Sequence, residues 1–250
     1  EWVVDLRTRT AFAAGHLHGA VNIGADGSFV TYLGWLLPWG APVTLLGETP
    51  EQVAEAQRDL VRIGIDRPAA AATGTPADWT GGDLPARLRT ATFVDLRVAM
   101  RDDPAPVVLD VRRHDERTGS HLLGSLHIPL HELPGRVAEV PVDREVWVHC
   151  AAGYRASIAA SLLARAGITV VLVDDAYDRA APEWVALEGL TKGLEIRLPI
   201  GHSFFDHGGV ERHEVRTKWW HEEPGSFRDV AIVGRHEADR VPDHPLPEDY

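Results

Sequence analysis

Two long stretches of this sequence repeat each other, and this repetition restricts the possible folds more than any other feature. The stretch around Asp5 aligns with the stretch around Asp110 at an offset of 105 residues. Residues 43–65 align with residues 146–168 at an offset of 103, so the two-residue change falls in a connecting loop. A repeat of this length predicts two tandem copies of one supersecondary unit, which suits the length of the chain.

Each copy alternates strand patterns with helix patterns. Residues 146–148 are the apolar run Val-Trp-Val, and apolar residues then recur at helical spacing: Ile158, Ala159, Leu162, Leu163 and Ala166. This alternation predicts an α/β fold with two tandem units, each a parallel sheet with helices on both faces, plus a short C-terminal extension. We expect the units at residues 1–84 and 88–180 and the extension at 181–250, with residues 73–87 containing the Gly- and Pro-rich linker.

Cys150, the only cysteine of the chain, opens the loop between this strand and this helix. Backbone amides at such a junction can point at one spot, and the positive end of the following helix favours an anion there. A thiol in that position ionises more readily than a free thiol, and the thiolate is the nucleophile. Arg155 adds a fixed charge, and Gly153 lets the backbone bend near the bound group. A buried structural cysteine is the alternative, but the C-x-x-G-x-R pattern favours a nucleophile.

Over residues 88 to 180 the chain resembles the rhodanese sulfurtransferases. The resemblance rests on the Cys150 loop, on Val107–Arg112 followed by Glu116, and on Ser120–Pro129, which is similar to the family's "GHIPGAxNIP" stretch. It implies that Cys150 accepts a sulfane sulfur from thiosulfate or a persulfide donor, carries it as a persulfide, and passes it to a thiol or cyanide. It also implies a catalytic or binding role for Arg155, substrate-binding amides at Ala151, Ala152, Gly153 and Tyr154, and supporting roles for Asp110 and Arg112.

Two other functions remain open. The related phosphatases and arsenate reductases carry one more residue between cysteine and arginine than the six-residue span here, so sulfur transfer is favoured over phosphate chemistry. A non-catalytic sulfur-binding or regulatory module is the second alternative. The chain departs from the family at Asp174–Asp178, where a Gly-Gly turn is usual, and this departure puts part of the pocket wall in question.

The first copy lacks the residues needed for this chemistry. Gly47 stands at the position of the cysteine, and Gln52 stands at the position of the arginine. The neighbouring Glu48 and Glu51 would repel an anionic donor. We therefore expect residues 1–84 to form a folded but catalytically inactive copy, and residues 88–180 to contain everything required for persulfide formation.

Composition limits the partners. The net charge of −12 comes without any basic stripe, which argues against nucleic-acid binding. No apolar run approaches the ~18 residues of a membrane span. A single cysteine excludes an internal disulfide framework and is easiest to keep reduced in the cytoplasm, which we take as the expected location. We expect no cofactor; the partners would be a small-molecule sulfur donor and a thiol acceptor.

The two ends of the sequence carry weaker signals. Residues 27–38 look similar to the first rhodanese unit of proteins that fuse a metallo-β-lactamase-like hydrolase to two such units. Because Glu1 enters a strand directly, we expect the polypeptide to continue upstream, and the resemblance implies that this upstream part would be a metallo-hydrolase domain. In the tail, Leu194–Leu198 and Val230–Val233 predict strands.

The histidines are expected to be structural. His202–His207 resembles a metallo-β-lactamase H-x-H-x-D-H motif, but Phe204 occupies the second histidine position, so we expect no metal site. His16, His121 and His149 are likewise expected to be structural, because sulfur transfer needs a stabilised anion more than a general base.

Overall fold

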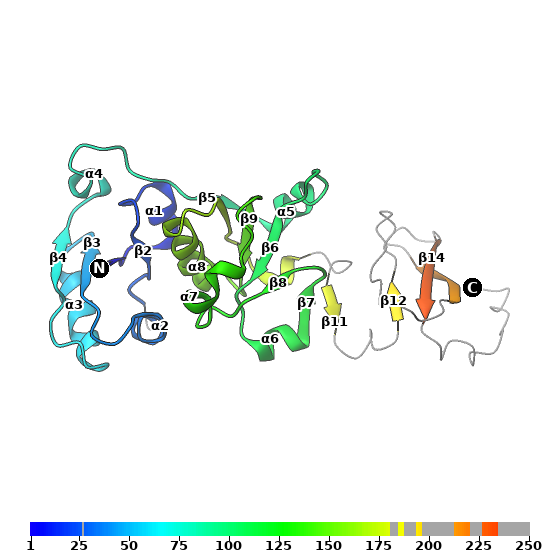
Figure 1. Ribbon diagram of the computed structural model, residues 1–250, viewed down its shortest axis with the longest axis horizontal. Helices are drawn as coiled ribbons and strands as arrows, with labels where there is room; N and C mark the ends of the chain where they lie inside the picture. Colours follow the sequence, from blue (N-terminus) through cyan, green and yellow to red (C-terminus); the bar gives the residue numbers. More distant parts are fainter. Residues whose placement is uncertain (27, 181–184, 188–193, 197–212, 221–226, 235–250) are drawn as a thin grey trace. The chain divides into compact units, whose positions relative to one another are not determined.

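Parallel strands connected by helices build most of residues 1–180. The computed structural model describes residues 1–26, 28–180, 185–187, 194–196, 213–220 and 227–234 (Figure 1). The chain divides into two compact units, one formed by residues 1–117 and 121–184 and the other by residues 118–120 and 185–250. The first compact unit contains two separate parallel sheets.

The first sheet has four parallel strands in the order β2-β1-β3-β4. These strands are β1 (Trp2–Asp5), β2 (Val21–Asn22), β3 (Val43–Gly47) and β4 (Ala70–Thr73). Its helices are α1 (Arg9–Ala14), α2 (Phe29–Leu36), α3 (Pro50–Val61) and α4 (Pro76–Trp79). Local signals fix the helix starts: Thr49 accepts a hydrogen bond from Gln52 N at 3.2 Å, and Pro50 supplies the first helical residue of α3.

The second sheet has five strands in the order β5-β10-β9-β6-β8, again parallel. They are β5 (Arg89–Ala91), β6 (Val107–Asp110), β8 (Leu126–His127), β9 (Val146–His149) and β10 (Val170–Val173). Between and after them lie α5 (Phe93–Ala99), α6 (His114–Gly119), β7 (Ser120–Leu122), α7 (Leu133–Arg136), the 3-10 turns η1 (Val137–Glu139) and η2 (Tyr177–Arg179), and α8 (Tyr154–Arg165). Every residue of β9 and β10 is buried, as expected for central strands covered on both faces.

The strand order recurs in the two sheets. Strands β8-β6-β9-β10 follow the same order as β2-β1-β3-β4, and β5 is added at the outer edge. The predicted α/β fold with parallel sheets is therefore confirmed. The boundaries at 1–84 and 88–180, and the assignment of the first stretch to a tandem unit of the same family, stay predictions.

Helix α8 lies between the two sheets in Figure 1. It packs against β9 and β10 and also contacts β2 of the first sheet. Asn22 of β2 accepts a hydrogen bond from Ser157 Oγ at 2.7 Å and donates its backbone N–H to Ser161 Oγ at 3.0 Å. All three residues are buried, so these bonds satisfy polar groups that water cannot reach. The helix that follows Cys150 is thus held from both sides.

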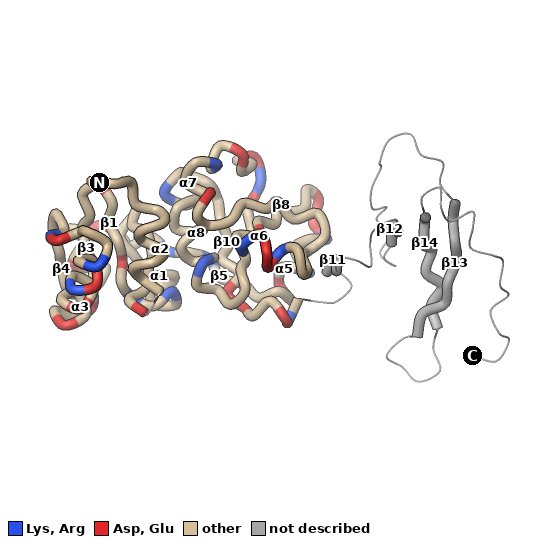
Figure 2. The backbone as a smooth tube through the Cα atoms, turned by 90° about the horizontal axis from the view of Figure 1, so that it is seen from below, with Lys and Arg blue, Asp and Glu red and all other residues tan. Residues whose placement is uncertain are grey.

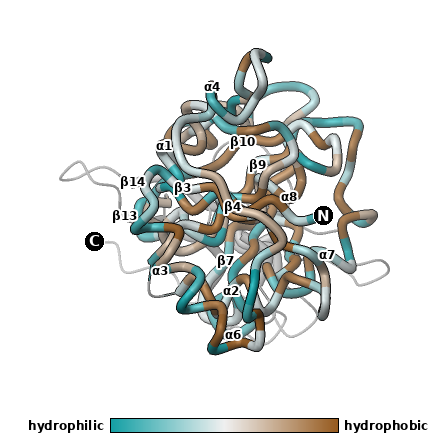
Figure 3. The backbone as a smooth tube through the Cα atoms, turned by 90° about the vertical axis from the view of Figure 1, so that its left-hand side faces the viewer, coloured by the Kyte–Doolittle hydropathy of each residue, from teal (hydrophilic) through white to brown (hydrophobic). Residues whose placement is uncertain are grey.

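Charge and hydropathy are distributed as in an ordinary packed α/β protein. Figure 2 shows basic and acidic residues interspersed along the described backbone. Figure 3 shows hydrophobic segments gathered where β9, β10 and α8 pack. None of the helices described here is long and apolar enough to cross a membrane.

The second compact unit contains a sheet of three antiparallel strands in the order β12-β14-β13. The strands are β12 (Leu194–Ile196), β13 (His213–Trp220) and β14 (Phe227–Gly234), and a further short strand, β11, covers Val185–Leu187. Strands predicted around 194–198 and 230–233 are therefore confirmed. The His202–His207 segment lies outside the described residues.

Candidate active site

Cys150 comes directly after the buried strand β9 and begins the loop that leads into α8. The residue is 2% exposed and is not in a disulfide. Gly153 ends the loop with a φ of 89°, a conformation that glycine adopts without strain. Within the described part of the chain, the backbone amides of residues 151–155 have no protein acceptor. The strand-loop-helix arrangement predicted from the sequence is therefore present, with free amides beside the thiol.

Arg155, in the first turn of α8, is held by a carboxylate. Its Nη1 and Nη2 donate to the two carboxylate oxygens of Glu116 at 2.5 and 2.7 Å. This bond from Arg155 is the main cause of a lowered pKa at Glu116, and in turn it raises the pKa of Arg155. A bidentate pair fixes the plane of the guanidinium. The sequence pointed to Glu116 only as part of a family stretch, and its role as the partner of Arg155 was missed.

Asp110 and Arg112 form a buried ion pair at the end of β6. Arg112 Nη2 donates to Asp110 Oδ2 at 2.7 Å, and both Nε and the backbone N–H of Arg112 donate to Oδ1 at 3.0 Å. Burial favours a higher pKa for Asp110, but the neighbouring His149 and the bonds from Arg112 lower it. The Tyr177 ring covers the guanidinium, with its centroid 3.7 Å from Arg112 Cζ. Asp110 Oδ2 lies 3.9 Å from Nε2 of His149, the residue before Cys150, and the supporting role expected for the pair stays a prediction.

His149, the residue before Cys150, lies among aromatic rings. Its ring stacks on Tyr177 at a centroid distance of 5.6 Å and meets Phe93 edge-on at 5.5 Å. Burial lowers the pKa of His149 to about 4, so the ring is neutral at pH 7. Burial also lowers the pKa values of His16 and His121. These surroundings suit the structural role expected for the three histidines.

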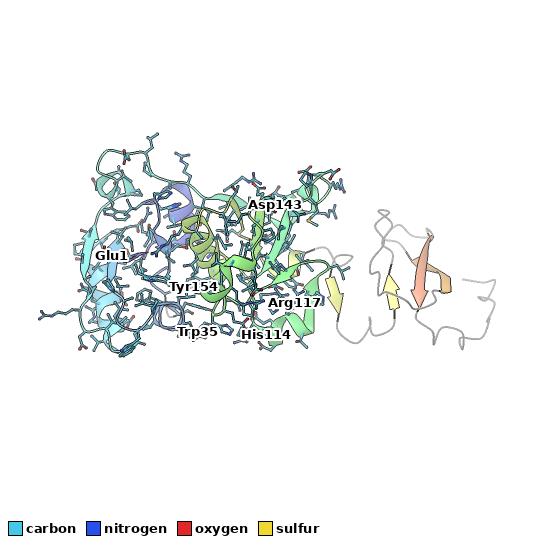
Figure 4. All side chains as sticks on the ribbon, in the orientation of Figure 1. Glu1, Trp35, His114, Arg117, Asp143 and Tyr154 are labelled. Atoms are coloured by element: carbon cyan, nitrogen blue, oxygen red, sulfur yellow. The ribbon has the colours of Figure 1, made fainter. Side chains whose placement is uncertain are left out.

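Residues of the first sheet border the cysteine loop. The Tyr154 hydroxyl donates to the carbonyl oxygen of Gly24 at 2.7 Å. Tyr32 of α2 lies 5.4 Å from the Tyr154 ring, and Trp35 lies 5.3 Å from Tyr32; Trp35 and Tyr154 are labelled in Figure 4. Burial raises the pKa of Tyr32, Arg155 opposes this effect, and Cys150 adds to it. No motif or periodicity indicated that the first copy contributes to this environment.

The departure from the family pattern at Asp174–Asp178 builds a turn that holds the loop. Asp175 accepts hydrogen bonds from Ala176 N at 2.9 Å, Phe93 N at 3.3 Å and Arg179 Nη1 at 3.1 Å. Tyr177 N donates to the carbonyl oxygen of Ala151 in the cysteine loop at 2.9 Å. Acidic side chains thus satisfy this turn where the family usually has glycines.

The equivalent loop of the first sheet is filled by a side chain. Gln52 Oε1 accepts from Glu48 N at 2.8 Å, and Gln52 Nε2 donates to the carbonyl oxygen of Leu6 at 3.1 Å. A β carbon at Gly47 would lie 3.0 Å from Gln52 Oε1 and 2.8 Å from Val53 Cγ2. The glutamine amide therefore occupies the loop, and no thiol or cation is present there.

The stretch that contains the cysteine loop matches a known protein family. The sequence model of the rhodanese-like domain family matches residues 94–181. A sulfurtransferase of Allochromatium vinosum is 30% identical over 73 residues, which cover 29% of this chain and 68% of that protein. The family match does not extend over residues 1–84. Among the described residues, no cluster of His, Cys, Asp and Glu side chains is arranged to hold a metal ion.

Two other relatives align over different lengths. An HTH-type transcriptional regulator of Mycobacterium tuberculosis is 30% identical over 145 residues, which cover 57% of this chain and 59% of that protein. An uncharacterized protein of Bacillus subtilis is 32% identical over 84 residues, which cover 34% of this chain and 64% of that protein. The chain thus spans about six tenths of the length of these two relatives.

Proposed function

We propose, from the premise that this chain belongs to the rhodanese-like family, that it is a sulfurtransferase acting through a persulfide on Cys150. The observation that carries the proposal is the position of Cys150 at the start of a loop whose amides have no acceptor in the part of the chain that the structure describes. A thiolate and a persulfide are both anions, and such a loop stabilises an anion at either stage. The relative named a sulfurtransferase supports the same class of reaction.

The first half of the reaction loads the cysteine. The Cys150 thiolate attacks the outer sulfur of thiosulfate, the sulfur–sulfur bond of thiosulfate breaks, and sulfite leaves with the electron pair. The product is a Cys150 persulfide anion. In this scheme the amides of Ala151, Ala152, Gly153 and Tyr154 hold the anion, and Arg155, fixed by Glu116, supplies the positive charge.

The second half of the reaction removes the outer sulfur from the Cys150 persulfide. A thiolate or cyanide attacks the outer sulfur of the persulfide, the bond between the two sulfurs breaks, and the Cys150 thiolate leaves. Cyanide becomes thiocyanate and a thiol becomes a persulfide. Because Cys150 is the only cysteine in this sequence, the sulfur leaves on another molecule. Asp110 and Arg112 act only by supporting the loop.

Mass spectrometry of the intact protein tests the proposal. Thiosulfate treatment should add one sulfur atom to the wild-type chain, and cyanide should then remove it as thiocyanate. Cys150→Ser keeps the size of the side chain and loses the soft nucleophile, so the variant should fold but gain no sulfur. Transfer activity that persists in Cys150→Ser would rule out Cys150 as the carrier.

A non-catalytic sulfur-binding module is the second candidate, and the burial of Cys150 favours it. Only 2% of this residue is exposed, which limits the access of an acceptor. One relative is named an HTH-type transcriptional regulator and not a sulfurtransferase. A persulfide that forms and is not passed on, or no adduct with any donor, would favour this role. The upstream metallo-hydrolase and the cytoplasmic location stay predictions.

A further inference from the structure

An ion pair connects the first sheet to the turn after β10. Arg9, the first residue of α1, donates from Nε to Asp174 Oδ1 at 2.5 Å. Asp174 follows β10 directly, and its backbone N–H donates to the carbonyl oxygen of Ala91 at 2.9 Å. The two side chains are 39% and 21% exposed, so the pair is partly shielded from water. The backbone of Asp174 is therefore fixed by the second sheet, and its charge is paired by the first.

This ion pair lies against the cysteine loop. A β carbon built on Gly153 would overlap Asp174 Oδ1 and would lie 2.9 Å from Arg9 Nε. Two residues earlier in the loop, Ala151 is bound by Tyr177 of the same turn. The turn therefore contacts the loop at two points, and the carboxylate of Asp174 lies at one of them.

A carboxylate in this position works against the proposed chemistry. Thiosulfate and the Cys150 persulfide are both anions, and a second negative charge beside the loop raises their energy. The next acidic residue, Asp175, is already bound by Arg179 and by the backbone amides of Phe93 and Ala176. Arg9 is the cation that Asp174 contacts in the described structure.

We propose that Arg9 is a positioning residue for the Cys150 loop. It neutralises the negative charge of Asp174 beside Gly153, so that the loop accepts an anionic sulfur donor. The inference rests on the proposed sulfur transfer and extends it, because it gives the first sheet a part in the reaction although that sheet has no nucleophile.

Removing the two charges of the ion pair one at a time tests the proposal, because the two variants should have opposite effects on kcat/KM. Arg9→Gln leaves Asp174 unpaired and should lower kcat/KM for thiosulfate roughly tenfold, mainly through KM, as expected for one partly exposed charge beside an anion. Asp174→Asn leaves a cation beside the loop and should leave kcat/KM unchanged or higher. The double variant Arg9→Gln/Asp174→Asn should recover most of the loss, and Arg9→Lys should retain most of the activity.

A purely structural ion pair gives a different pattern. Asp174→Asn would then lose as much activity as Arg9→Gln, and this result would overturn the proposal. Thermal unfolding of each variant accompanies the kinetics. If Arg9→Gln does not fold, Asp174→Asn and Arg9→Lys still decide, because both keep a cation at position 9 and both should remain active.

Thiol labelling separates this proposal from the proposed function. Because Cys150 is the only cysteine in this sequence, methanethiosulfonate reagents report on that thiol alone. Arg9→Gln should slow a sulfonate-bearing reagent roughly tenfold relative to an uncharged one. An unchanged ratio would refute the role of Arg9. A wild-type protein that labels with this charge preference but never takes sulfur from thiosulfate would contradict only the proposed transfer.

Discussion

Each of the two parallel sheets has the same buried Asp-x-Arg ion pair at the end of its first central strand, and the two sheets differ in the loop that follows the neighbouring strand. In the first sheet Arg7 Nη2 donates to Asp5 Oδ2 at 2.6 Å, and in the second Arg112 Nη2 donates to Asp110 Oδ2 at 2.7 Å. In both, the backbone N–H and Nε of the arginine donate to the other carboxylate oxygen at 3.0 Å. Above them, one loop holds a glutamine amide and the other holds a thiol.

This difference separates the residues that build the fold from those that could do chemistry. The buried Asp-x-Arg pair closes the end of the first central strand whether or not a reaction takes place above it. In the first sheet, the Gln52 side chain accepts a hydrogen bond from Glu48 N and donates one to the Leu6 carbonyl oxygen, so the first copy itself fills its loop. The amides of the cysteine loop have no acceptor among the described residues, so they are available to water or to a bound anion.

The largest expected effect comes from breaking the shared ion pair. Asp5→Asn and Asp110→Asn each leave a buried arginine without its countercharge, so each should lower the free energy of unfolding by about 3–5 kcal/mol. Only Asp110→Asn should also slow sulfur loading of Cys150. Chemical denaturation and intact-mass labelling measure the two effects. If both variants slow the sulfur loading of Cys150 equally, the Asp110–Arg112 pair has no special connection with the cysteine loop.

A second difference between the sheets lies one position before the loops, where His149 corresponds to Leu46. The pKa of His149 is about 4 in the folded chain against an ordinary 6.5, so the unfolded state binds the proton more tightly. The contribution of neutral His149 to the free energy of unfolding is fully present above pH 6.5. It is lost as the pH falls toward 4, by on the order of 3 kcal/mol.

His149→Leu, which copies the first sheet, should remove that part of the pH dependence. Urea unfolding of both proteins between pH 7 and about 4 gives the difference, and the other histidines cancel in the comparison. The same pH dependence in wild type and variant would show that His149 is not the group that takes up the proton.

Arg155 corresponds to Gln52 of the first sheet. Substitution by lysine tests how much the two-point hydrogen bonding of its guanidinium contributes. Arg155→Lys keeps the charge but loses the two-point bond to Glu116. Binding of thiosulfate should weaken by about 1–3 kcal/mol. Steady-state kinetics gives the value, and Arg165→Lys at the other end of α8 is the matched control. Unchanged kcat/KM would leave the backbone amides as the main anion site.

Local patterns in the sequence predicted the site's framework but not its connections. The strand before Cys150, the glycine turn and the helix after it are short-range features, and the structure has all three. Glu116 is 39 residues from Arg155, and Asp174 is 165 residues from Arg9. No periodicity or loop motif encodes which charged side chains meet across such separations, because packing of the two sheets decides it.

The same limit affects the expectation that residues 88–180 suffice for persulfide formation. Ser157 and Ser161 of α8 bond to Asn22, and Tyr154 bonds to Gly24. Removal of residues 1–84 would leave these polar groups without partners and expose the face of α8 that now meets β2. The expectation stays a prediction, and only the full chain keeps these partners of α8 and Tyr154.

The smallest expected effect concerns the filled loop of the first sheet. A β carbon at Gly47 lies 2.8 Å from Val53 Cγ2 and 3.0 Å from Gln52 Oε1, so Gly47→Ala must displace one of them. Overpacking of this kind costs about 1–3 kcal/mol. Gly135→Ala is the matched control, because its β carbon meets nothing within 4 Å and helix α7 favours alanine over glycine. Chemical denaturation should show a loss for Gly47→Ala and none for Gly135→Ala. If both variants are as stable as the wild type, Gln52 moves aside freely and the first loop has room for a side chain. The lack of space around Gly47 would then not explain why this copy has no nucleophile.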